Sequence, residues 1–349
     1  MAEGELTLES PPSTGTPLLR GAARVAGLIA IGLGVAGMTA WCAAALYYST
    51  RGGSRAGAIL AIGFLLATAL AFLLLPHRRR TLVGFLVAVA AIVVWWLCLP
   101  ASNDREWLPE VSVTPWASRE GDLVTIHGVR NFDYRTETDF TPRWENRTYD
   151  LRALDAADLI AVYWAGKAIA HILLSFGFGG RDYVAVSIET RKARGQSYST
   201  VAGFFKQYEL VYIAADERDV IRVRTNYRQP QEDVYVYPLQ VPRGNIRRIF
   251  LDYLRTMNDM RERPRFYNTL TTNCTTTIAT HAHVNPGSPP MSWKILLSGY
   301  VPQYAYELGK LDRTLPFAEL ERRVWVNERA HAADHDPAFS RRIREVARR

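Results

Sequence analysis

The sequence predicts an α+β protein in which three N-terminal transmembrane helices precede an exported domain with an antiparallel sheet. Three runs without a charged residue, Val25–Tyr48, Gly57–Leu75 and Thr81–Leu99, are each 19 to 24 residues long, close to the roughly 20 residues that a helix needs to cross a bilayer. Beyond them, period-two apolar runs alternate with turn residues and are followed by one amphipathic helical pattern. With 48% hydrophobic residues and three cysteines in 349 residues, a disordered chain and a disulfide scaffold are both excluded.

The basic residues beside the three runs predict their orientation. The N-terminal flank and the second loop together hold five arginines, whereas the first loop holds two: Arg20, Arg24, Arg78, Arg79 and Arg80 against Arg51 and Arg55. The positive-inside rule therefore places the N-terminus in the cytoplasm and everything after Leu99 on the other side. Trp95, Trp96 and Trp107 are expected to form an interfacial aromatic belt at that exit.

Composition divides the chain into five segments. We expect a disordered cytoplasmic tail (1–19), a membrane anchor (20–100), a linker (101–121), a globular domain (122–327) and a basic C-terminal tail (328–349). The seven Arg and three Glu of the first 100 residues leave 35 basic and 31 acidic residues for the remainder. The resulting net charge of +4 beyond residue 100 is mild, so no nucleic-acid partner is expected.

Within the domain, period-two patterns predict strands at 123–132, 151–162, 208–214, 220–226 and 234–239, and a helical pattern covers 244–261. The clearest feature is a hairpin, AIAHILLSFGFGG-RDYVAVSIETR, which turns at Gly179–Gly180. The charged residues at 216–219 are expected to form surface ion pairs with Arg222, Arg224 and Arg228.

Cys274 is the candidate nucleophile. Cys42 and Cys98 lie inside the predicted spans, so Cys274 is the lone thiol of the exported domain. Capping residues ending at Asn273 predict a helix that begins near Cys274. Free N–H groups and the helix dipole would stabilise a thiolate there, and they suit an oxyanion. A buried, inert core cysteine is the alternative.

A nucleophilic cysteine needs a base, and His171 is the candidate. It interrupts an apolar strand, where a histidine is more often a satisfied core residue. Folding the hairpin about Gly179–Gly180, however, places His171 opposite residues 188–190, so that Glu189 is able to orient its ring. Ser187 is the alternative orienting residue.

The remaining histidines are weaker candidates for the base. His281 lies two helical turns from Cys274, and His331 and His335 lie in a polar segment. The H-x-H pair of His281 and His283 has no third ligand nearby in the sequence, so neither a metal nor another cofactor is expected.

Several ordered motifs resemble the family named for the N-terminal periplasmic domain of Lnb, a bacterial lipoprotein N-acyltransferase. They are HILLSFGF (171–178), SIETR (187–191), YELVY (208–212), DERD (216–219), VYVYPL (234–239) and FYNTLTTNCTT (266–276). The resemblance implies a permuted papain-like fold, similar to NlpC-type and lecithin:retinol acyltransferase-like enzymes. By this match Cys274 is the nucleophile and His171 the base; Glu189 follows only from the strand pairing. Asn273, Thr275 and Ser187 are placed at the substrate or oxyanion site.

The activity implied is acyl transfer from a phospholipid, through a thioester on Cys274, to an amine such as the N-terminus of a lipoprotein. The expected partners are therefore a phospholipid acyl donor, an amine acceptor and the bilayer. The expected location is the bacterial inner membrane, with the domain in the periplasm. An NlpC-like cell-wall peptidase or amidase and a non-catalytic membrane-anchored binding domain are the alternatives. An apolar groove favours acyl transfer, and a polar, open groove favours a peptidoglycan substrate.

Overall fold

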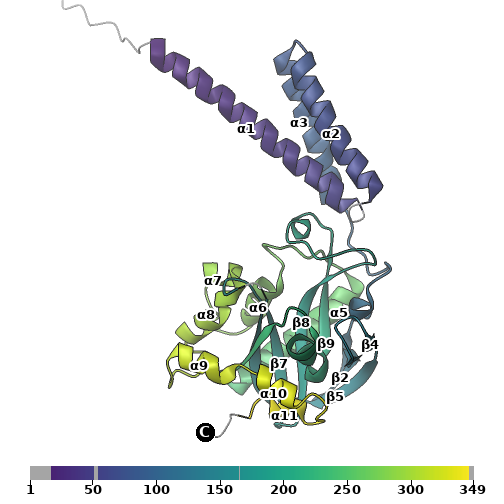
Figure 1. The fold of residues 1–349 in the computed structure, drawn as a ribbon, viewed down its shortest axis with the longest axis vertical. Coiled ribbons are helices and arrows are strands. Elements are labelled where there is room, and N and C mark those ends of the chain that lie inside the picture. Colours follow the sequence, from purple (N-terminus) through teal and green to yellow (C-terminus); the bar gives the residue numbers. More distant parts are fainter. Residues whose placement is uncertain (1–16, 51–53, 165, 346–349) are drawn as a thin grey trace, which may run out of the picture. The chain divides into compact units, whose positions relative to one another are not determined.

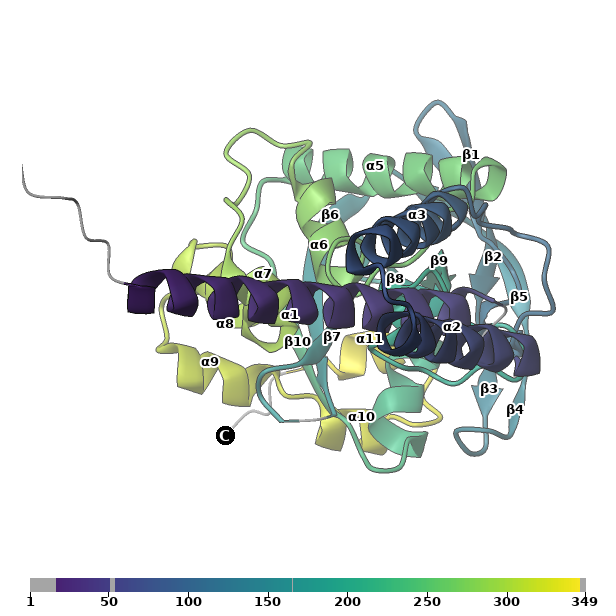
Figure 2. The same ribbon diagram turned by 90° about the horizontal axis from the view of Figure 1, so that it is seen from above.

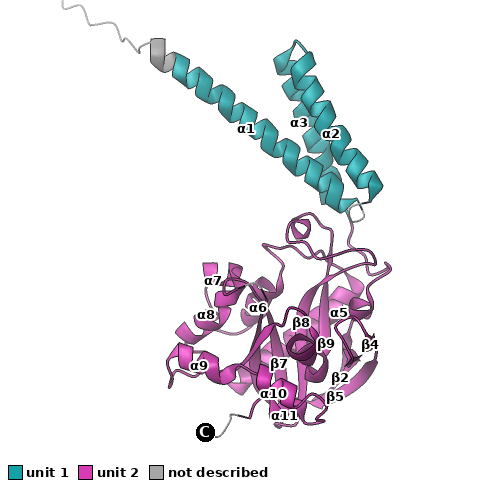
Figure 3. Ribbon diagram, viewed as in Figure 1, with its two compact units in different colours: residues 1–99 teal, residues 100–349 magenta. Residues whose placement is uncertain are grey.

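The computed structural model describes residues 17–50, 54–164 and 166–345. The chain forms two compact units, Met1–Leu99 and Pro100–Arg349 (Figure 3), which are described separately.

Unit 1 consists of three long apolar helices, α1 (Pro17–Ser49), α2 (Arg55–Leu74) and α3 (Arg78–Leu97), and all three are long and apolar enough to cross a membrane. The three predicted spans are thus confirmed as helices. At Gly57 the backbones of α1 and α2 approach so closely that an added Cβ would lie 2.7 Å from the carbonyl oxygen of Tyr47. Most of the expected N-terminal tail, residues 1–16, lies outside the described residues.

Unit 2 is built on an eight-stranded sheet with the order β1-β2-β9-β8-β7-β6-β10, in which β5 also pairs with β2 (Figure 1). The strands are β1 (Trp116–Glu120), β2 (Leu123–Arg130), β5 (Trp144–Asp150), β6 (Leu154–Tyr163), β7 (Ala170–Phe178), β8 (Asp182–Arg191), β9 (Glu209–Ala215) and β10 (Asp233–Pro238). A separate two-stranded ribbon joins β3 (Asp133–Tyr134) to β4 (Phe140–Thr141). The expected β7–β8 hairpin is present.

The central strands are buried on both sides because helices cover both faces of the sheet (Figure 2). On one face, Phe176 of β7 packs against Phe250 and Tyr253 of α5 (Arg243–Glu262), and α6 (Cys274–Ala282) packs against β7 and β8. On the other face, Leu173 and its neighbours join a core cluster with residues of α4 (Glu217–Val220), α10 (Asn327–Ala332) and α11 (Phe339–Arg342). Short helices α7 (Trp293–Leu296), α8 (Val301–Glu307) and α9 (Phe317–Val324) complete the unit.

Two predictions about the sheet need correction. Residues 220–226 are not a strand: α4 ends at Val220, and a π-helical turn covers Val223–Tyr227. The Asp216 side chain accepts the N–H of Arg218 and starts a helical turn in place of a hairpin. The sheet is also mixed and not purely antiparallel, because β2 meets β9 in a parallel pairing at Arg130 and Ala215.

The charged residues expected on the surface near residue 220 are buried. Glu217, Asp219, Arg222 and Arg224 expose 3% or less of their surface. Their charges are paired with partners from distant segments, such as Arg130, which makes a bidentate contact with Asp219. Local charge patterning did not predict this burial, because the partners are up to 127 residues away in sequence.

Both ends of the predicted domain also differ from the expectation. Trp107 does not lie in an aromatic belt: it is buried in unit 2, with the Arg191 guanidinium 4.3 Å from its ring centroid. Residues 328–345, expected as a tail, include α10 and α11, and Phe339 and Ile343 are fully buried. Apolar side chains at these positions therefore make the segment part of the domain core; residues 346–349 lie outside the described residues.

Candidate active site

The site forms where strands β7 and β8 separate. Their pairing begins next to the turn, where Phe178 faces Asp182, and it ends where Leu174 faces Val186. Beyond that point β7 pairs with β6 alone and β8 with β9 alone. Continuing the register brings His171 opposite Glu189, as the hairpin predicts. The separation leaves room between the strands for groups from another element.

Three polar side chains from the two separated strands form a hydrogen-bonded chain. His171 Nε2 lies 2.6 Å from Ser187 Oγ, and the Ser187 hydroxyl donates to Glu189 Oε1 at 2.8 Å. The imidazole and the carboxylate are 3.5 Å apart. Because the single Ser187 proton is directed to Glu189, the imidazole must donate from Nε2 and carry its lone pair on Nδ1. In the described part of the chain Nδ1 has no hydrogen-bond partner.

The ionisation of this chain follows from burial and from nearby charges. Burial lowers the pKa of His171 to about 4, although the Glu189 charge acts in the opposite direction. Burial alone would raise the pKa of Glu189, but His171, Arg224 and the Ser187 hydroxyl hold it well below its usual range. At neutral pH the pair is therefore a neutral imidazole beside a carboxylate.

Arg224 is a site residue that the sequence did not indicate. Its guanidinium donates to Glu189 Oε1 at 2.9 Å and to the Val220 carbonyl, and the side chain is almost fully buried. It was missed because residues 220–226 read as a strand with exposed charges.

Cys274 is the first residue of α6, as expected, and a capping box fixes the start of this helix. Asn273 Oδ1 accepts the N–H of Thr276, while the Thr276 hydroxyl accepts the N–H of Asn273. Asn273 Nδ2 also donates to the Thr269 carbonyl, and the Thr275 hydroxyl bonds to Asn273 and Ile295. The side chains of Asn273 and Thr275 and the Asn273 N–H are thus engaged in the cap, which leaves the backbone N–H of Thr275 for any oxyanion role.

The Cys274 sulfur lies among backbone amides from two elements. The backbone N–H groups of Ile172, Cys274 and Thr275 each favour the thiolate and so lower the pKa of the Cys274 thiol. Ile172 directly follows His171 in β7, and no hydrogen bond joins the Cys274 sulfur to the His171 imidazole in the described part of the chain. Burial outweighs the amides and raises the pKa of the Cys274 thiol to about 11. This differs from the expected resting thiolate.

Two tyrosines missed by the sequence analysis also lie near Cys274. Burial raises the pKa of both tyrosines, and a negative charge on Cys274 raises it further, after burial for Tyr267 and after burial and Tyr212 for Tyr253. The Tyr253 hydroxyl is buried and has no hydrogen-bond partner among the described residues. In the sequence only Tyr267, in the segment just before α6, lies close to Cys274, whereas Tyr253 is brought there by the packing of α5.

The H-x-H pair is divided between separate structural roles. His281 is buried and bonded at Nδ1 to Asp252 and at Nε2 to the Tyr212 hydroxyl, each at 2.7 Å. His283 Nδ1 instead faces the Ala279 carbonyl. Both nitrogens of His281 are occupied, and within residues 17–50, 54–164 and 166–345 no group of three potential ligands gathers for a metal.

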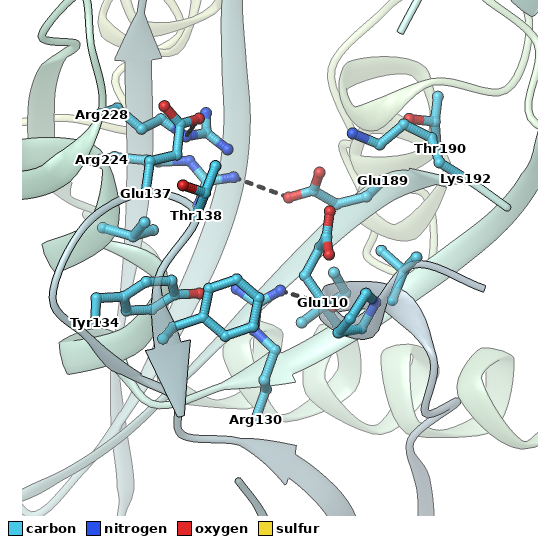
Figure 4. A pocket seen from close by; sticks show the side chains of 15 residues that line it. Glu110, Arg130, Tyr134, Glu137, Thr138, Glu189, Thr190, Lys192, Arg224 and Arg228 are labelled. Atoms are coloured by element: carbon cyan, nitrogen blue, oxygen red, sulfur yellow. Dashed lines mark hydrogen bonds and ion pairs between the residues drawn. The ribbon is translucent and has the colours of Figure 1, made fainter. Parts of the chain in front are cut away.

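A polar pocket of about 390 Å³ adjoins the acid end of the chain, and Glu189 forms part of its wall (Figure 4). Arg224 and Arg228 stand on one side, while Glu110 and Lys192 come from other segments. The Glu189 carboxylate neutralises the positive charge of the buried Arg224. Arg224 therefore adds no free positive charge to the wall of the pocket.

Comparison with known proteins agrees with the family predicted from the motifs. Residues 140–299 match the family model of the Lnb N-terminal periplasmic domain, a range that includes His171, Ser187, Glu189 and Cys274. No curated protein and no solved structure matches the chain. With its three candidate membrane-spanning helices, the chain is a membrane-anchored protein whose periplasmic domain contains the Lnb N-terminal family match.

Proposed function

We propose that this protein is a cysteine-dependent acyltransferase that moves a phospholipid acyl chain through a Cys274 thioester to an amine. The observation that carries the proposal is the His171–Ser187–Glu189 chain on β7 and β8, the two strands against which α6 packs with Cys274 as its first residue. A nucleophile, a base, a group that orients the base and oxyanion donors are the parts that acyl transfer requires.

In the first step the thiol attacks the ester carbonyl of a phospholipid. His171 Nδ1 takes the thiol proton as the sulfur–carbon bond forms, and the carbonyl oxygen becomes an oxyanion. The amides of Cys274 and Thr275 are the donors suited to that oxyanion. When the carbon–oxygen bond breaks, His171 returns the proton to the leaving alkoxide, so that a thioester and a lysophospholipid remain.

In the second step a neutral amine attacks the thioester. His171 accepts a proton from the attacking nitrogen, the carbon–sulfur bond breaks, and the proton restores the thiol. The products are an amide and free Cys274. A diacylglyceryl-cysteine lipoprotein, with its N-terminal amino group at the membrane surface, is the acceptor that the family match favours.

The location and the finer fold are part of the proposal. The arginine distribution around the three spans favours the bacterial inner membrane with a cytoplasmic N-terminus. A cysteine at a helix N-terminus packed on a sheet that supplies the histidine favours the permuted papain-like arrangement. In this location the acyl donors are concentrated where the tethered domain works.

The test is mass spectrometry of the full chain purified with phospholipid. An acyl adduct is expected on the peptide that contains Cys274, and neutral hydroxylamine should release it because it is a thioester. Cys274→Ala and His171→Ala should abolish the adduct. Cys98→Ser is the control, since Cys98 is exposed and lies at the end of α3. An adduct confined to Cys98, or none at all, contradicts the proposal.

A cell-wall peptidase or amidase is the second candidate, and the polar pocket beside Glu189 is the observation that favours it. Its charged walls suit the amino and carboxyl groups of a peptide. Incubation of the full chain with purified muropeptides distinguishes the two activities: new amino termini that appear with wild type and not with Cys274→Ala would establish hydrolysis.

A further inference from the structure

Exposed apolar side chains of unit 2 are concentrated around the site. Among the described residues of this unit, the exposed large apolar side chains lie in the segments 164–169, 198–204, 270 and 291–297, with two exceptions, Val113 and Leu123. We define the apolar rim by six of them, each between 39% and 57% exposed: Ile169, Val201, Phe204, Leu270, Trp293 and Leu296.

Hydrogen bonds connect these segments to residues next to Cys274 and His171. Asn273, before the cysteine, bonds to Thr269, and Thr275, after it, bonds to the Ile295 carbonyl. Next to the histidine, the N–H of Ala170 donates to Ser298 Oγ. The 198–204 segment joins through the Thr269 hydroxyl, which donates to the Thr200 carbonyl. The segments that carry the rim residues are therefore joined to the residues of the candidate site.

The charge of these segments is entirely positive. No Asp or Glu occurs between Asp158 and Asp182, between Glu189 and Glu209, or between Glu262 and Glu307. The basic side chains in these three intervals include Lys167, Lys206 and Arg265. Lys294 lies there as well, but its ammonium is paired with the Glu307 carboxylate. Apolar side chains in segments that carry cations and no acidic residue are typical of surfaces that enter the interface of an anionic membrane.

The chain enters unit 2 beside the end of α5 and beside residues that flank the 198–204 segment in the sequence. Asn103 donates to the Met260 and Arg261 carbonyls, and Trp107 forms a β-bridge with Ala193, just before the 198–204 segment. Ser102, whose N–H bonds to Glu209, is the fifth residue after Leu97, the last residue of α3. Five residues of chain span at most about 18 Å, so this short connection keeps the start of unit 2 within reach of the membrane that holds α3.

We propose that the apolar rim docks into the lipid bilayer that holds the three spanning helices, so that an acyl chain passes from the membrane directly to Cys274. The occupant is the interfacial layer of an anionic phospholipid membrane. This inference rests on the proposed acyltransferase activity for its purpose, but the docking is measurable without catalysis.

Brominated lipid quenches tryptophan that enters the acyl layer, and Trp293 is the natural probe of the rim. The full chain is placed in nanodiscs of phosphatidylcholine and phosphatidylglycerol, with or without bromine on the phosphatidylcholine chains. The contribution of Trp293 is the difference between the emission of wild type and that of Trp293→Phe. This difference should disappear in brominated nanodiscs. The matched control is Trp116→Phe, because Trp116 stacks on His127 at the sheet edge; its contribution should survive bromination.

Two results would overturn the docking. One is an unquenched Trp293 emission at the long wavelength of a water-exposed indole. The other is an unquenched emission at short wavelength, which would mean that protein, such as a second copy of the chain, covers the rim.

Acylation by nanodisc phospholipid supplies an independent measurement. The Trp293→Ser/Leu296→Ser variant should acylate Cys274 about tenfold more slowly, whereas Leu123→Ser, which alters an equally exposed leucine outside the rim, should match wild type. Equal rates in the rim variant and wild type count against docking. Quenching of Trp293 without any Cys274 adduct would refute the acyltransferase and leave the docking intact.

Discussion

At Glu189, burial and charge act in opposite directions. Removal from water favours the neutral acid, but the Arg224 guanidinium at 2.9 Å and the Ser187 hydroxyl at 2.8 Å stabilise the carboxylate. The charged form prevails, so Glu189 is a fixed anion that selects the His171 tautomer with Nε2 protonated. Arg224 consequently acts on the imidazole through Glu189, as a positioning residue.

Replacement of Glu189 by Gln tests this arrangement at the residue scale. The Glu189 charge raises the pKa of His171, so its removal should shift the acid limb of Cys274 acylation to still lower pH and slow acylation at pH 7 by at least about tenfold. The rate of adduct formation against pH is the measurement. The control is Glu137→Gln, because Glu137 lines the same pocket but does not belong to the hydrogen-bonded chain of His171, Ser187 and Glu189. An unchanged pH profile would remove Glu189 from the mechanism.

The resting state of Cys274 gives a second prediction at this scale. A pKa of about 11 for the thiol and about 4 for His171 describes a neutral pair, so the thiolate fraction at pH 8 is about 100-fold below that of an ordinary thiol. Alkylation of Cys274 by iodoacetamide, followed by peptide mapping in a Cys42→Ser/Cys98→Ser background, should accelerate throughout the range from pH 7 to 10. Rapid alkylation that stays constant down to pH 5 would instead indicate a thiolate–imidazolium ion pair.

At the scale of secondary-structure elements, local patterns predicted the two halves of the site separately. The period-two hairpin brought His171 opposite Glu189, and the capping residues placed Cys274 at the start of a helix. The separation of β7 from β8 beyond Leu174 was not predictable, since it depends on α6 packing against both strands. Arg224 was missed for a similar reason: its partner Glu189 lies 35 residues away, and a local pattern carries no information on such a contact.

The capping box of α6 is the element whose loss should affect the nucleophile. Asn273→Ala removes the acceptor of the Thr276 N–H and the donor to Thr269, and should cost about 1–2 kcal/mol, or roughly 2–8 °C in Tm for a domain of this size. Because the same cap positions Cys274, acylation should fall further than stability alone explains. Thermal unfolding and adduct formation are measured together.

The control for the cap is Asp312→Ala, which removes a comparable turn acceptor for the Thr314 N–H, away from Cys274. It should lower Tm slightly and leave acylation unchanged. Equal acylation by Asn273→Ala and Asp312→Ala would show that the cap does not position the nucleophile.

At the scale of the whole molecule, the three apolar helices precede unit 2 in the sequence, and the segment 328–345 packs into the core of unit 2. The short connection after α3 limits the distance between the bilayer and Ser102, where the hydrogen bonds of unit 2 begin. At the other end, Phe339 and Ile343 enter the core cluster that lies under β6, β7 and β9. The periplasmic unit therefore depends on residues well beyond the family match that ends at 299.

Arg344 gives the clearest test of that dependence. Its guanidinium forms hydrogen bonds to Asp158 of β6 and to Glu217 of α4, both almost fully buried. Arg344→Met leaves two buried carboxylates without their cation, which should cost about 3–5 kcal/mol and lower Tm by roughly 6–20 °C. Thermal unfolding of the full chain in detergent measures the loss, with the exposed Arg341→Met as the control. A Tm equal to that of the control would mean that the C-terminal segment is dispensable for the folded domain.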